Sequence, residues 1–180
     1  MLMRSFVVLT IGKDLHTHEL EIALRSFAFM VAKVTPKHRK ALRLRLVGDS
    51  QQRMLLTHLI QRFELTKYVE WSSPYQTYFT DCHLMFSPTL QLDSVLVQHS
   101  LEAGVPVLTY DNSRSEQHID SSCGVLIPYR SGERAAQTFS DYLRMLYFDP
   151  EAQRFLKKGA IRRSQRQPIM LPAAALSLAS

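Results

Sequence analysis

The sequence has little of what a secreted or membrane-spanning protein needs. It contains two cysteines, Cys82 and Cys123, which lie far apart, each beside or within an apolar run. Buried free thiols fit this placement better than a disulfide, and this favours a reducing compartment. No apolar stretch approaches the ~20 residues that span a bilayer, and the run at 6–11 is shorter than a signal-peptide core. We therefore expect a cytoplasmic protein with at most peripheral membrane contact.

Charge of one sign is in excess. The formal net charge is +6, with much of the excess at 33–40 and 157–166. An anionic partner is therefore plausible, whether nucleic acid, a membrane surface or a phosphorylated ligand, although a solvated basic face explains the clusters equally simply. Aromatic side chains interleave with little positive charge, which argues against a stacking platform for nucleic acid. We expect no nucleic-acid partner. These aromatic residues are Tyr68, Trp71, Tyr75 and Tyr78.

Apolar and β-branched runs alternate with stretches of helical periodicity. Strands are predicted at 5–11, 42–47, 67–71, 83–86, 105–109 and 124–127. Helices are predicted at 19–34, 51–63, 74–80, 94–103, 132–147 and 150–163. The alternation predicts an α/β fold with a single Rossmann-like, doubly wound parallel sheet. Residues 1–163 form this domain, and residues 164–180 are expected to be a poorly ordered tail. Ligands of such sheets bind in the loops at the carboxyl ends of the strands.

Eight segments in order resemble a known domain. They include FVVLTIGKDLHTHELEIALRSFAFMVAK, LRLRLVGDS, YVEWSSP, DCHLMFSPT and HSLEAGVPVLTYD, with Glu116 eight residues before Gly124. Together they resemble the C-terminal, nucleotide-sugar-binding domain of retaining GT-B glycosyltransferases of the group 1, family 4 type, from Phe6 to Arg163. The resemblance implies half of a GT-B fold, without the N-terminal acceptor-binding domain.

The chain departs from the family's pattern at its acidic motif. The two glutamates of E-x7-E should fall at 91 and 99, where the sequence has Gln91 and His99. The Gly-Phe-Gly that follows the first glutamate is Leu92-Asp93-Ser94. The basic residue of the Gly-Arg loop persists as Lys13 after Gly12, and His18 replaces the lysine that follows.

The resemblance implies a donor site at these positions. A leaving nucleoside diphosphate needs cations or free backbone amides to stabilise its charge. Lys13 and His18 could supply donors to the phosphates, and the helix opened at Ser94 could supply amides. The implied donor-binding residues are Gly12, Lys13, His18, Gln91, Asp93, Ser94 and His99. No cofactor and no metal are expected, since His16-Thr17-His18 has no further ligand at a usable spacing.

Simpler interpretations of the same residues stay open. Lys13 could be a solvated loop lysine, and His18 could cap the following helix or be exposed. His99 could be a core histidine, and Gln91 and Asp93 could be turn and cap residues.

Two functions follow. The first is the donor half of a retaining glycosyl transfer, which binds a nucleotide sugar and is inactive alone unless a separate chain supplies the acceptor domain. The alternative is a non-catalytic binding or assembly protein that retains the glycosyltransferase fold.

Overall fold

Six parallel strands form one sheet in a computed structural model that describes residues 5–12, 15–72 and 78–166. Their order is β3-β2-β1-β4-β5-β6. The strands are β1 (Phe6–Ile11), β2 (Leu42–Val47), β3 (Val69–Ser72), β4 (Leu84–Ser87), β5 (Val107–Tyr110) and β6 (Gly124–Ile127). The strand order reverses between β1 and β4, so the prediction of a doubly wound parallel sheet is confirmed.

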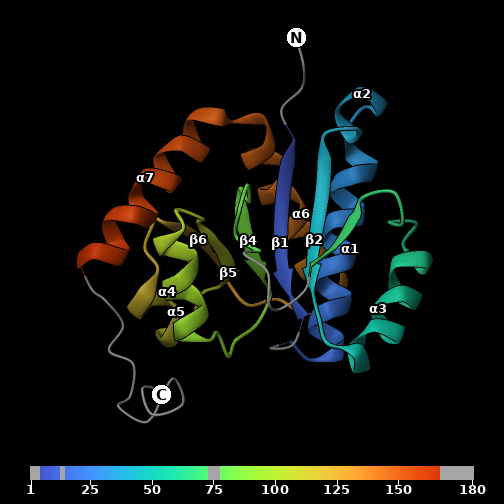
Figure 1. Cartoon of the computed structure of the whole chain (residues 1–180), viewed down its shortest axis with the longest axis horizontal. Helices are drawn as coiled ribbons and strands as arrows, with labels where there is room; N and C mark the ends of the chain where they lie inside the picture. The colour runs from blue at the N-terminus through green and yellow to red at the C-terminus, as the bar shows by residue number, and fades with distance from the viewer. Residues whose placement is uncertain (1–4, 13–14, 73–77, 167–180) are drawn as a thin grey trace.

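Helices cover both faces of this sheet (Figure 1). On one face, α1 (Thr17–Lys33), α3 (Ser50–Arg62) and α6 (Gly132–Phe148) enclose the larger core. On the other face, α4 (Ser94–Glu102) and α5 (Ser113–His118) pack with α7 (Pro150–Arg166) over a smaller core. α7 places Leu156 in the larger core and Ala160 in the smaller one, so it passes around the sheet beside β6. A single turn, α2 (Pro36–Arg39), joins α1 to β2.

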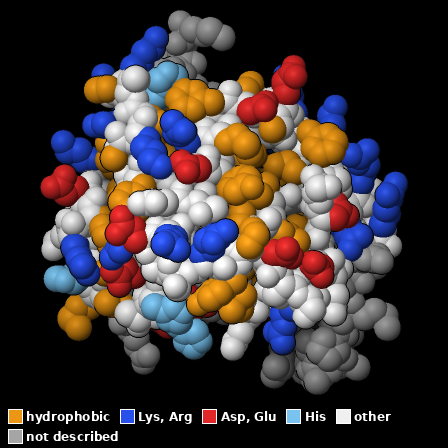
Figure 2. Space-filling model, turned by 180° about the vertical axis from the view of Figure 1, so that it is seen from behind, with side chains coloured by type: hydrophobic (Ala, Val, Ile, Leu, Met, Phe, Trp, Pro, Cys, Tyr) orange, Lys and Arg blue, Asp and Glu red, His pale blue; other side chains and the backbone are white. Residues whose placement is uncertain are grey.

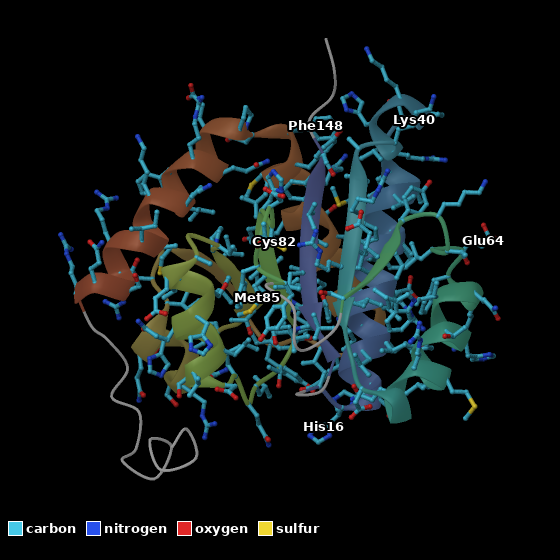
Figure 3. All side chains as sticks on the ribbon, viewed as in Figure 1. His16, Lys40, Glu64, Cys82, Met85 and Phe148 are labelled. Atoms are coloured by element: carbon cyan, nitrogen blue, oxygen red, sulfur yellow. The ribbon has the colours of Figure 1, made fainter. Side chains whose placement is uncertain are left out.

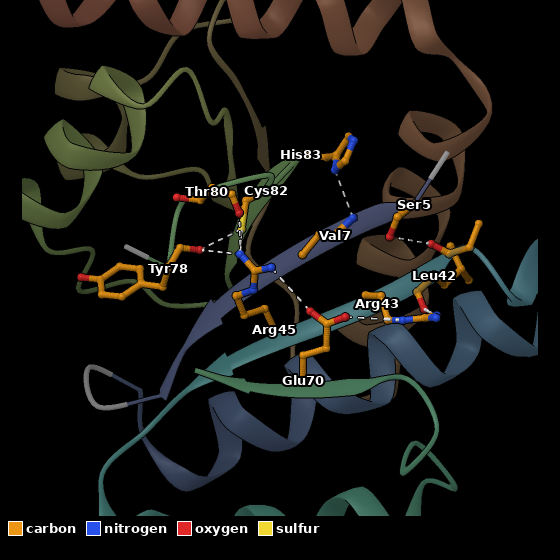
Figure 4. A network of polar contacts seen from close by, with 11 residues as sticks. Ser5, Val7, Leu42, Arg43, Arg45, Glu70, Tyr78, Thr80, Cys82 and His83 are labelled. Atoms are coloured by element: carbon orange, nitrogen blue, oxygen red, sulfur yellow. Dashed lines mark hydrogen bonds and ion pairs between the residues drawn. The ribbon is translucent and has the colours of Figure 1, made fainter. Parts of the chain in front are cut away.

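β2 shows how the sequence pattern directs the two faces. Its leucines at 42, 44 and 46 are buried in the larger core, whereas Arg43 and Arg45 alternate with them and point to the other face. There the Arg45 guanidinium donates to the carbonyl oxygens of Tyr78 (3.1 Å) and Thr80 (2.5 Å) and pairs with Glu70 (Figure 4). Tyr78, Phe79 and Cys82 also pack against the smaller core, so the segment before β4 is held to the sheet by Arg45 together with apolar contacts.

α7 is fastened by close backbone contact. A Cβ placed on Gly159 would lie 1.7 Å from the carbonyl oxygen of Ser122, so only glycine permits this approach. Farther along, Arg163 donates to the carbonyl oxygen of Gln117 (2.9 Å). The Nε2 of Gln98 in α4 donates to the backbone carbonyl oxygen of Ser164 (3.4 Å). The last part of the described chain is thereby held against α4 and α5.

Several predicted elements need correction. Residues 78–80 form turns and not the end of a predicted helix at 74–80, and 73–77 lie outside the described residues. The polar segment Ser113–His118, for which no element was predicted, is a helix because Asn112 accepts hydrogen bonds from the amides of Arg114 (2.9 Å) and Ser115 (3.1 Å). The loop expected after Pro36 contains α2, since proline favours the first position of a helix. α7 ends at Arg166 instead of Arg163, so the predicted tail loses residues 164–166 to the helix, and 167–180 lie outside the described residues.

Candidate functional site

The carboxyl ends of the parallel strands meet at one edge of the sheet, and all the predicted site residues belong to loops or helices that begin there. His16, at the lower end of the view in Figure 3, marks this edge, and Lys40 and Phe148 mark the opposite one. Gly12 and His18 follow β1, and residues 91–94 follow β4. β1 and β4 are neighbours at the point where the strand order reverses. This is where doubly wound sheets bind ligands.

Gly12 forms a tight turn at the end of β1. It is buried, and a Cβ there would lie 3.3 Å from both the Oε1 of Gln52 and the carbonyl oxygen of Val47. The Nε2 of Gln52 donates to the carbonyl oxygen of Gly12 at 2.8 Å, which ties the turn to α3. Lys13, the predicted phosphate ligand, lies outside the described residues.

The start of α1 exposes two histidines and buries a carboxylate. His18 is exposed, and its ring stacks parallel to that of His16 with centroids 6.0 Å apart. Glu19 is buried, and its carboxylate accepts a hydrogen bond from the amide of His16 at 2.8 Å. Sequence reasoning missed Glu19, although a carboxylate three residues after the helix start is a known capping pattern. One backbone amide at the start of α1 is therefore already satisfied.

Asp93 caps α4. Its carboxylate accepts hydrogen bonds from the amides of Val95 (2.8 Å) and Leu96 (3.2 Å). The expectation that the helix start at Ser94 offers free amides is therefore wrong for these two groups. The interpretation of Asp93 as a cap residue is confirmed.

The loop before α4 is held by buried threonines. The hydroxyl of Thr109 donates to the carbonyl oxygen of Thr89 at 3.3 Å, and the amide of Gln91 donates to the hydroxyl of Thr89 at 3.0 Å. Leu92 is buried beneath the loop, whereas the side chain of Gln91 is exposed. Gln91 is therefore accessible from the carboxyl edge and takes no part in the core.

His99 is exposed on α4, so the alternative of a core histidine is wrong. The buried polar residue is its neighbour Gln98, which donates to Glu102 at 2.7 Å and to Ser164. Five residues of helix separate His99 from Ser94, a rise of about 7.5 Å. An accessible imidazole at that distance can bond a hydroxyl group.

Carboxylates dominate the described helix starts at this edge. Besides Glu19 and Asp93, Asp49 caps α3 by accepting from the amide of Gln52 at 2.8 Å. The buried hydroxyl of Tyr110 at the end of β5 donates to the carbonyl oxygen of Arg130. Burial, together with the charges of Tyr129 and Glu19, raises the pKa of Tyr110 to about 12. An anion that binds where α1 and α4 begin must therefore compete with the carboxylates of Glu19 and Asp93.

Within residues 5–12, 15–72 and 78–166, no three His, Cys, Asp or Glu side chains are grouped so that they could hold a metal ion. In the same part of the chain, none of the helices has the length and apolarity needed to cross a bilayer.

Comparison by sequence finds no match, either among protein families or among curated proteins. Comparison by structure finds glycosyltransferases. The pneumococcal O-GlcNAc transferase GtfA, solved in complex with UDP and GlcNAc, matches 91% of this chain with a TM-score of 0.76 and 13% identity. WaaG, a glycosyltransferase involved in lipopolysaccharide biosynthesis, matches 97% with a TM-score of 0.79 and 18% identity. Sucrose-phosphate synthase from Thermosynechococcus elongatus matches 99% with a TM-score of 0.74 and 19% identity.

The match covers only part of each enzyme. This chain spans 33% of GtfA, 47% of WaaG and 44% of sucrose-phosphate synthase. The described fold is thus that of one half of a GT-B glycosyltransferase, and the expected resemblance to the C-terminal half is confirmed at the level of the fold.

Proposed function

We propose that this chain binds a nucleoside diphosphate sugar at the carboxyl edge of its sheet and acts as the donor half of a retaining glycosyl transfer. The observation that carries the proposal is the match of at least nine-tenths of the chain to a third or half of several glycosyltransferases, one of them solved with UDP. The Gly12 turn and the start of α4 meet at the strand-order reversal, where such a ligand would sit.

The donor diphosphate would be held by cations more than by helix amides. Asp93 occupies the amides of Val95 and Leu96, so Lys13 and protonated His18 carry most of the charge neutralisation in this proposal. Gln91 and His99 stand where the resemblance places two glutamates. His99 can still bond a ribose hydroxyl, but it offers one acceptor where a carboxylate offers several.

The chain alone is expected to transfer no sugar. A GT-B active site lies between two domains, and this chain contributes one wall. The proposal assigns the positioning of the acceptor to the other wall, and positioning contributes on the order of 7–11 kcal/mol to such reactions. A separate chain that supplies an acceptor domain would restore activity. No metal ion or other cofactor is part of the proposal.

Thermal unfolding in the presence of millimolar UDP, GDP or ADP tests the binding proposal. A ligand at a hundred times its Kd stabilises the folded state by about 2.7 kcal/mol. For a chain of this size we expect an increase in Tm of roughly 5–10 °C. Lys13→Ala should remove most of the increase, whereas Lys40→Ala, at the opposite edge of the sheet (Figure 3), should leave it unchanged. An unchanged Tm with all three nucleotides refutes the proposal.

A second function is favoured by one specific observation. The chain's own Glu19, Asp49 and Asp93 accept hydrogen bonds from four backbone amides at the starts of α1, α3 and α4, so these amides need no ligand. We infer that a non-catalytic protein that retains the fold for binding or assembly is the alternative. It predicts a Tm that no nucleotide changes, in the unmodified chain and in Asp93→Asn alike.

A further inference from the structure

A groove of about 530 Å³ lies along the outer edge of β6, two strands from β4 in the sheet order. Its walls come from β6 and the turn before it, the end of α6 and the first half of α7, with Asp111 after β5 and Glu116 in α5. Most of the lining is apolar and is drawn from both faces of the sheet, since Val125 packs with the larger core and Leu126 with the smaller one. The apolar lining residues are Val125, Leu126, Met145, Leu146, Phe155 and Leu156.

The backbone of β6 offers hydrogen-bonding groups to this groove. Within the described chain, β5 is the one strand that pairs with β6. The carbonyl oxygens of Cys123 and Ile127 accept bonds from the amides of Val107 and Asp111 in the β5 segment. Because bonding direction alternates along a strand, the N–H and C=O of Leu126 face the opposite way, towards the groove.

Two large apolar side chains at the rim are half exposed. The exposed fractions are 48% for Met145 and 54% for Phe155, and Phe148, one turn beyond Met145, is also exposed. Figure 2 shows hydrophobic side chains gathered from the middle of this face towards the α7 side. An exposed apolar patch beside an unpaired strand edge is typical of a surface that binds another chain.

The charged residues of the lining are both acidic. Asp111 and Glu116 are exposed, and among the described residues neither forms an ion pair. The chain as a whole carries a net charge of +6, whereas the charged side chains that line this groove are negative. A second copy of the groove would bring no basic residue to these carboxylates.

We propose that this groove binds an extended, apolar segment of a partner protein that carries a lysine or arginine. The segment adds a short strand to β6 through the backbone of Leu126, places apolar side chains against Met145 and Phe155, and pairs its cation with Asp111 and Glu116. Recognition of this kind takes affinity from the backbone and specificity from the side chains. It is independent of nucleotide binding.

Two labelled pentapeptides test this proposal on the full chain. One is acetyl-Lys-Val-Ile-Val-Thr-amide, and the other has glutamate in place of lysine. Fluorescence anisotropy of the labelled peptides measures each Kd, and the NMR amide resonance of Leu126 shows whether the peptide binds beside β6. We expect the lysine peptide to shift that resonance and to bind about fivefold more tightly than the glutamate peptide, a ratio in line with exposed ion pairs.

Matched variants separate the charge from the apolar contact. Asp111→Asn with Glu116→Gln should bring the ratio of the two Kd values close to one, whereas the control Glu133→Gln with Asp141→Asn, on α6, should leave it unchanged. Phe155→Ser should weaken both peptides alike.

Three results would overturn the proposal. The first is equal binding of the two peptides, or no shift at Leu126. The second is a Leu126 amide that is protected from hydrogen exchange in the free chain and loses this protection when residues 167–180 are removed, which would make the occupant the chain's own segment. The third is protection that rises with protein concentration, which would make the occupant a second copy.

Discussion

Replacing Asp93 by asparagine should strengthen nucleoside diphosphate binding and leave the fold almost as stable. The Asp93 carboxylate accepts hydrogen bonds from the amides of Val95 and Leu96, and an asparagine oxygen can accept them as well. The substitution therefore removes a negative charge and keeps the cap. The lost interaction between charge and helix dipole costs about 0.3–1 kcal/mol. Asp93→Ala loses the cap too and should cost roughly 0.5–2 kcal/mol more.

The gain in affinity follows from the charge that is removed. Two unit charges 4 Å apart in water interact by about 1 kcal/mol, and a nucleoside diphosphate carries at least two. Removing the repulsion should tighten binding of UDP by roughly five- to tenfold. Urea unfolding measures the stability, and isothermal titration with UDP measures the affinity.

Asp49→Asn is the matched control, since Asp49 caps α3 after β2, a strand that β1 separates from β4. It should lower stability by a similar amount and leave the UDP affinity unchanged. An Asp93→Asn variant that is stable but binds UDP no better than the unmodified chain would show that this carboxylate does not face the phosphates.

Three further predictions concern the fold. Arg45→Met should destabilise the chain by about 2 kcal/mol in a urea titration, because it removes the guanidinium that bonds the carbonyl oxygens of Tyr78 and Thr80 and pairs with Glu70. Arg43→Met removes the more exposed ion pair with Glu70 and should cost less than about 1 kcal/mol in the same titration. Gly159→Ala should lower the free energy of unfolding by more than about 3 kcal/mol, because the added Cβ would overlap the Ser122 carbonyl oxygen. The control Lys158→Ala, at an exposed position of the same helix, should change the urea midpoint little. Burial, only partly offset by Arg45, raises the pKa of the Cys82 thiol from 9.0 to about 11. Folding stability that is complete below pH 9 should therefore fall as the pH rises from 9 to 11, and Cys82→Ser should remove that part of the decline.

The regular elements could be predicted because their signals are local. The alternation of leucine and arginine predicts β2 at the bounds that the structure shows, and β6 agrees at both ends. The amphipathic period of α6 predicts its start and comes within one residue of its end. In each case the residues that define the element also bury its apolar side.

What could not be predicted depends on contacts between distant residues or on a cap without periodicity. The turn at Tyr78 is held by Arg45, 33 residues earlier in the chain. α5 has no apolar period, and its helical form depends on Asn112. Hydrophobic periodicity, from which the elements were predicted, contains neither signal.

The sequence predicts where the residues of the candidate site lie in the fold, but not which hydrogen bonds they make or which of them are exposed. The structure brings Gly12, His18 and Asp93 to neighbouring strand ends, as the sequence predicted. The same Asp93 carboxylate caps α4 and occupies the amides of Val95 and Leu96, so its role as a cap and the availability of these amides are one property. The apolar neighbours of His99 suggest that it is buried. In the structure Gln98 lies on the buried face of α4, and His99 lies on the exposed face.

The capped helix starts determine how this edge can bind an anion. Where helix amides are free, a phosphate gains their hydrogen bonds outright, whereas here it must replace bonds that Asp93 already makes. The binding free energy gained from the amides is then only the difference between their hydrogen bonds to a phosphate and those to a carboxylate. The displaced carboxylate also remains nearby and repels the anion. In the proposed site, net affinity must therefore come from side-chain donors such as Lys13 and His18, or from a partner chain across the edge. Where the resemblance has Gly-Phe-Gly, the segment Leu92-Asp93-Ser94 thus caps α4 without a ligand, and in the proposed function donor binding depends on what the rest of the site supplies.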